Sequence, residues 1–90
     1  MSRITNKSID STINNLNLAI GIDNAVCLHT GSVIGAYTYD HTDSGYRLTQ
    51  YTSNCYDVVT IFDFWFTTSE FYYIVLAYRA GLLKKNTNLD

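Results

Sequence analysis

The sequence predicts one α+β domain over residues 1–90, made of a helix, an antiparallel meander of three or four strands, and a second helix. Three observations predict this order. Apolar residues recur at helical spacing near the N-terminus, β-branched and aromatic residues punctuated by turn residues fill the middle, and a capping motif opens an apolar stretch near the C-terminus. Both helices are expected on one face of the sheet, because so short a chain has room for one shared core.

The first helix is expected over about residues 7–20. Its apolar positions recur at spacings of four, three and four residues, which places them on one stripe: Ile9, Ile13, Leu16 and Ile20. Thr5, Asn6 and Ser8 can cap its start, Asp10 suits the positive end of the helix dipole, and Gly21 is a natural stop.

The middle of the chain is rich in Val, Ile, Thr and Tyr, which is typical of strands. Turn residues at 30–32, 40–45 and 53–54 divide it. We therefore expect short strands near residues 24–29, 33–39, 46–52 and 55–62. The polar stretch 40–45 is expected to be a loop.

The second helix is expected over about residues 68–83. Thr67 and Glu70 match a capping box, Phe66 and Phe71 are placed for a hydrophobic staple, and Lys84 with Lys85 suits the C-terminal end of the dipole. One apolar stripe can face the sheet: Phe71, Ile74, Val75, Tyr78 and Leu82. A second apolar stripe needs another cover, which can be the first helix or another chain, and we expect it to form a homodimer interface: Tyr72, Tyr73, Leu76 and Leu83.

Charge argues against binding through phosphate backbones. The net charge is −2 and the region 23–70 holds six acids against one base, Arg47. The helix, strands, helix order resembles double-stranded RNA-binding domains, but the basic contacts those domains use are missing. A nucleic-acid-binding module or a nucleic-acid mimic therefore remains a minor alternative.

The sequence predicts a soluble, cytoplasmic protein without a cofactor. The first residues show no secretion signal, and the longest apolar run, 71–78, is too short to span a membrane. Cys27 and Cys55 form no metal-binding motif and are expected as small core residues. A metal cluster of both cysteines with His29, and an acid–base pair of His41 with Asp43, are the alternatives; strand packing and solvated loop charge are favoured instead.

Several short motifs lie between residues 35 and 82: Gly35-Ala36-Tyr37, Gly45-Tyr46-Arg47-Leu48, Asp57-Val58, Thr67 to Glu70, and Gly81-Leu82. In this pattern the chain resembles a set of small uncharacterised phage-encoded proteins. An acidic loop between the two Tyr motifs, and Cys55-Tyr56 in place of Gly-Gly before Asp57, depart from the pattern. The resemblance implies phage or mobile-element origin and the helix, sheet, helix order, and it brings no catalytic residue.

The segment Asp63-Phe64-Trp65-Phe66 is the strongest candidate binding element, because aromatic side chains dominate interface hot spots. A lid over the core is the structural alternative. We expect a non-enzymatic accessory protein that binds a host protein and inhibits or redirects it, in host takeover or anti-defence. A self-assembling homo-oligomer is the alternative. The residues expected to bind the partner are Trp65, Phe64, Tyr72, Tyr73, Asp40, Asp43 and Asp63, with no catalytic residue and no metal ligand.

Overall fold

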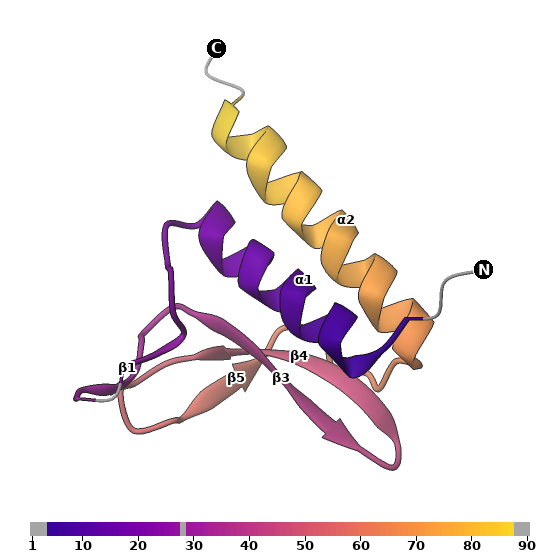
Figure 1. Cartoon of the computed structure of the whole chain (residues 1–90), viewed down its shortest axis with the longest axis horizontal. Coiled ribbons are helices and arrows are strands. Elements are labelled where there is room, and N and C mark those ends of the chain that lie inside the picture. The colour runs from indigo at the N-terminus through magenta and orange to yellow at the C-terminus, as the bar shows by residue number, and fades with distance from the viewer. Residues whose placement is uncertain (1–3, 28, 88–90) are drawn as a thin grey trace.

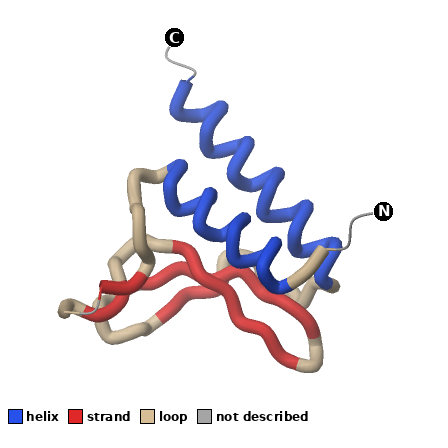
Figure 2. Tube along the Cα trace, in the orientation of Figure 1, coloured by secondary structure: helices blue, strands red, loops and turns tan. Residues whose placement is uncertain are grey.

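A computed structural model describes residues 4–27 and 29–87, with side chains described through residue 84. Its elements are α1 (Asn6–Ala19), β1 (Val26–Cys27), β2 (Gly31–Ser32), β3 (Tyr37–Thr42), β4 (Gly45–Tyr51), β5 (Val58–Thr60) and α2 (Thr68–Thr87). Both helices lie side by side on one face of an antiparallel sheet (Figures 1 and 2). The predicted α+β class is confirmed.

Local signals at both ends of α1 fix its limits within one residue of the prediction. The Thr5 hydroxyl accepts a hydrogen bond from the Ser8 N–H at 3.3 Å, and the Ser8 hydroxyl accepts one from the Thr5 N–H at 3.4 Å. At the other end Gly21 adopts a φ of 85°, and the Ile22 N–H bonds to the Asn17 carbonyl at 2.9 Å. This is the Schellman arrangement that glycine favours.

The sheet has the strand order β3-β4-β5, and β1 and β2 form a separate small hairpin. The expected strands at 24–29 and 55–62 are too long, because only 26–27 and 58–60 pair; Leu28 lies outside the described residues. The expected loop 40–45 is also wrong. Pairing from Tyr37 with Gln50 to Thr42 with Gly45 extends β3 through residue 42 and leaves a two-residue turn.

The strand expected at 33–39 begins too early, because its first residues form a turn. Ala36 donates its N–H to the Val33 carbonyl at 3.1 Å, and Gly35 has a φ of 91°, so residues 33–36 make a turn. That turn carries the chain from the small hairpin into β3. Local β propensity in this stretch does not reveal it.

The segment that joins β5 to α2 stays attached to β4 at both of its ends. The Ile61 N–H bonds to the Leu48 carbonyl at 2.9 Å, and Phe66 exchanges two backbone hydrogen bonds of 2.8 Å with Tyr46. Residues 62–65 therefore lie opposite the single residue Arg47 and bulge out of the ladder. We call residues 62–65 the bulge.

The predicted start of α2 is confirmed, whereas its predicted end is wrong. The Thr67 N–H bonds to Glu70 Oε1 at 2.9 Å and the Glu70 N–H to the Thr67 hydroxyl at 3.3 Å, which confirms the predicted start. The helix continues to Thr87 instead of ending at 83, and the side chain of Lys85 lies outside the described residues.

The core lies between the helix pair and the sheet. Phe71 and Val75 of α2 meet α1 and the strands there, and the buried cluster consists of Ile9, Ile13, Leu16, Tyr37, Tyr46, Leu48, Phe71 and Val75. Four of the five residues in the first predicted stripe of α2 thus face or border the core, with Tyr78 and Leu82 packed at its margin. The fifth, Ile74, is half-buried and is not among the residues packed against the core.

Candidate binding surface

The bulge presents Phe64 to solvent beside the start of α2. Phe64 is 58% exposed, and its ring meets that of Phe66 edge to face at 4.9 Å between centroids. Together with the first two turns of α2 these rings border an open hollow of about 460 Å³, lined by Phe64, Phe66, Ser69, Glu70, Tyr73 and Ile74. We call this the aromatic hollow.

The aromatic hollow is mostly apolar and has one acid in its lining. Tyr73 is 62% exposed and forms one wall. Glu70 is the acid in the lining, and Asp63 is exposed beside Phe64 in the bulge. A concave apolar surface with a few polar groups at its border is the arrangement that accepts a partner's apolar side chain.

Trp65 lies on the other face of the sheet. Arg47 alternates along β4 with Tyr46 and Leu48, which are buried beneath the helices, so its side chain points away from them. Its guanidinium carbon lies 4.3 Å from the centre of the Trp65 ring. Trp65 is half-buried in this contact.

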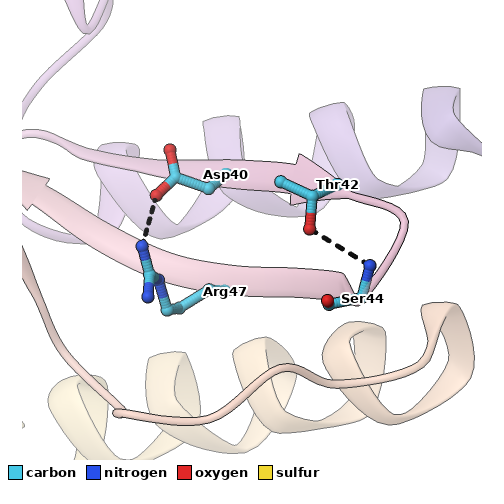
Figure 3. A network of polar contacts seen from close by, with 4 residues as sticks. All are labelled: Asp40, Thr42, Ser44 and Arg47. Atoms are coloured by element: carbon cyan, nitrogen blue, oxygen red, sulfur yellow. Dashed lines mark hydrogen bonds and ion pairs between the residues drawn. The ribbon is translucent and has the colours of Figure 1, made fainter.

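Arg47 also bonds across the hairpin to Asp40, with 3.1 Å between Nη2 and the carboxylate (Figure 3). Its Nε atom is buried and has no hydrogen-bond partner among the described residues. The guanidinium is thus held between a carboxylate and an indole ring, and Trp65 covers it. For Trp65 the geometry favours the covering role over that of an exposed anchor.

The residues expected to bind a partner therefore do not form one site. Phe64 and Tyr73 meet at the aromatic hollow, and Asp40 joins Trp65 through Arg47. Asp63 is exposed in the bulge but does not line the hollow. Asp43 lies in the turn between β3 and β4.

Tyr72 is half-buried against the core and borders a second hollow, between α1 and α2, together with Leu76. Of the stripe expected as an oligomer interface, Tyr73 and Leu76 are exposed, whereas Tyr72 and Leu83 are half-buried.

Sequence reasoning missed Phe66 and Ile74 as lining residues of the aromatic hollow, and it missed Arg47 altogether. Their positions in the sequence predict a staple for Phe66 and a core stripe for Ile74, and Phe66 does pack at the core margin. The pattern of apolar residues could not show that their outer edges remain accessible. The signal available for Arg47 was its position as the one base in an acidic region.

The histidines and cysteines do not form a common site. His41 lies in β3, where its ring stacks on Tyr46 at 4.0 Å and 7°, and His29 follows the end of β1, so the expected strand position of His29 is wrong. Cys55 is exposed, so it is not a core residue. Within residues 4–27 and 29–87 no group of three or more His, Cys, Asp or Glu side chains could hold a metal ion.

Cys27 is a free, half-buried thiol at the β1–β2 hairpin. A hydrogen bond with the Thr30 side chain, and then bonds with the backbone of His29 and Thr30, lower the pKa of this thiol below its ordinary value. Its thiolate is therefore favoured at lower pH than that of a free cysteine.

No helix in the described part of the chain is long and apolar enough to cross a membrane. The fold and the hollow define an α+β domain with an exposed aromatic surface. Comparison with protein-family models, with curated proteins and with solved structures finds no match to the chain.

Proposed function

We propose that this chain is a non-enzymatic accessory protein of phage or mobile-element type, which binds a host protein in the host cytoplasm and inhibits or redirects it. The aromatic hollow is the observation that carries the proposal. It offers two large aromatic side chains, Phe64 and Tyr73, that the chain leaves more than half exposed. Aromatic side chains with much apolar area and few rotatable bonds are the usual anchors of protein interfaces.

The chemistry of the hollow indicates what it accepts. Its apolar lining suits an aliphatic or aromatic side chain of the target, and Glu70 suits a basic residue next to that side chain. Because Glu70 is exposed, its attraction mainly speeds association and weakens with added salt.

Pulldown from a lysate of the host, with the whole chain as bait, tests the proposal. Phe64→Ala should lose the captured protein, with affinity reduced about 30-fold, as for a hot spot worth about 2 kcal/mol. Ile34→Ala is the matched control, because Ile34 is 66% exposed and does not line the hollow. Equal capture by the wild-type chain and both variants would remove the hollow from the proposal.

Self-assembly is the second candidate, and a specific observation favours it. The helix α2 exposes Tyr73 and Leu76, and Leu76 also borders the hollow between α1 and α2.

A further inference from the structure

The outer side of α2 is a strip of apolar residues about two and a half turns long. Phe71 and Val75 mark the side of the helix that faces the core. Opposite to them, the exposed positions from 73 to 81 carry no charged side chain: Tyr73, Leu76, Ala77, Ala80 and Gly81. A helix side that faces only water normally carries charged and polar residues. We call these five residues the α2 strip.

Gly81 has no explanation within a single copy of the chain. It lies well inside α2, where glycine is about 1 kcal/mol less favourable than alanine. A Cβ atom at this position would meet nothing within 4 Å, and its φ is not positive. Neither space nor backbone conformation requires glycine there, whereas the close approach of another molecule would.

The charges at the two ends of the strip are opposite and symmetrically placed. Glu70 and Lys84 are both exposed and lie seven residues before and after Ala77. Positions 70, 73, 77, 80 and 84 have the alternating spacing of three and four residues that keeps one helix side in contact with another helix. If two copies pair in opposite directions about Ala77, Glu70 of each faces Lys84 of the other.

The same symmetry relates the largest and the smallest side chains of the strip. Tyr73 and Gly81 are each four residues from Ala77, so each tyrosine lies across from the glycine of the other copy. The small residues between them allow the helix backbones to approach closely. The strip is therefore complementary to itself in shape and in charge, which an isologous interface requires.

We propose that the α2 strip binds the α2 strip of a second copy of this chain, antiparallel and with the two-fold axis at Ala77. This inference goes beyond the proposed host-protein binding and does not depend on it. Glu70 and Tyr73 also line the aromatic hollow. A second copy therefore competes with a target for these two side chains.

Sedimentation equilibrium of the whole chain measures the pairing. Wild type should reach twice the chain mass of 10.2 kDa as concentration rises. Gly81→Gln, which places a helix-favouring but bulky residue opposite Tyr73, should raise the dimer dissociation constant at least tenfold while raising the Tm of the monomer. A mass of 10.2 kDa at every concentration, or an unchanged dissociation constant in Gly81→Gln, would overturn the proposal.

Ala77→Glu supplies an independent variant, because it brings two like charges together at the two-fold axis. It should abolish the dimer, whereas Asn14→Glu, which adds the same charge on the exposed side of α1, should leave the dissociation constant unchanged. Equal weakening by both variants would mean that net charge, and not the strip, controls association.

Cross-linking tests the register in a Cys27→Ser, Cys55→Ser background. Under mild oxidation Ala77→Cys should form a disulfide-linked dimer, because the two thiols meet at the axis. Ser69→Cys should not, because antiparallel copies separate these positions by about 24 Å along the helix axis. Cross-linking through residue 69 but not residue 77 would refute the antiparallel register.

Phe64→Ala distinguishes the two proposals, because Phe64 lies outside the strip. This variant should reduce target capture and leave the dimer intact.

Discussion

Asn17 satisfies both backbone polar groups of Tyr37 with one side chain. Its Nδ2 donates to the Tyr37 carbonyl at 3.0 Å, and its Oδ1 accepts from the Tyr37 N–H at 2.6 Å. Asn17 is 2% exposed, so these bonds replace water inside the protein. They join the end of α1 to the start of β3. The sequence offers no sign of this, because Asn14, Asn15 and Asn17 look alike in it.

Replacing Asn17 by Ala should lower the free energy of unfolding by about 3 kcal/mol, because a buried donor and a buried acceptor lose their partners. Asn14→Ala, on the exposed side of the same helix, should change it by less than about 0.5 kcal/mol. Urea unfolding of both variants measures the difference. Equal stabilities would show that water replaces the Asn17 amide.

Two tyrosines with raised pKa values should make the free energy of unfolding depend on pH in the alkaline range. Burial, and then a hydrogen bond to Asp10, raise the pKa of Tyr39 from 10.0 to about 12. Burial, and then a hydrogen bond with Tyr78, raise the pKa of Tyr37. A group whose pKa is higher in the folded state stabilises that state fully below its unfolded pKa and loses this effect as pH rises toward the folded value.

The free energy of unfolding should therefore fall between about pH 10 and pH 12. Denaturant unfolding at increasing pH measures this decline. Tyr39→Phe removes the titrating hydroxyl and should make the decline shallower. A decline of the same steepness in Tyr39→Phe would assign the alkaline instability to other groups.

At the scale of elements, local signals predicted the helices well and the strands poorly. A capping box and a glycine stop act within a few residues, so Thr5, Gly21 and Thr67 could be identified from their neighbours alone. The ends of β3 and β5 depend on which distant segment they pair with. The bulge shows this dependence most clearly, because it forms only when Phe66 pairs with the distant residue Tyr46.

The capping box of α2 should contribute measurably to stability. Thr67→Ala removes the hydroxyl that accepts the Glu70 N–H, and it should cost about 1 kcal/mol. Thr67→Ser keeps the hydroxyl and should cost less. Thermal unfolding of the two variants gives the comparison, and an equal loss in both would show that the cap does not act through its hydroxyl.

Gly45 should tolerate substitution less well than Gly21. Both adopt positive φ, 126° and 85° respectively, so alanine is strained at each. A Cβ atom at Gly45 would also collide with the Phe66 carbonyl oxygen, whereas one at Gly21 meets nothing within 4 Å. Gly45→Ala should therefore reduce the Tm clearly more than Gly21→Ala. Equal reductions would mean that the Phe66 segment moves away without cost.

At the scale of the whole molecule, the aromatic segment could be identified from the sequence, but the face of the sheet on which each of its side chains lies could not. Phe64 and Trp65 are neighbours in the bulge, yet one lines the hollow and the other covers Arg47 on the far face of the sheet. Their separation depends on four residues lying opposite one in the ladder, which periodicity does not reveal. The two helices and the core stripes, in contrast, follow from local spacing.

The central claim is that the aromatic hollow is a binding surface and not part of the core. Measuring both the Tm and the retention of the captured host protein on Phe64→Ala tests it most directly. We expect the Tm to stay close to that of wild type, because Phe64 is 58% exposed, while retention falls about 30-fold. A clear fall in Tm with undiminished retention of the host protein would contradict the claim.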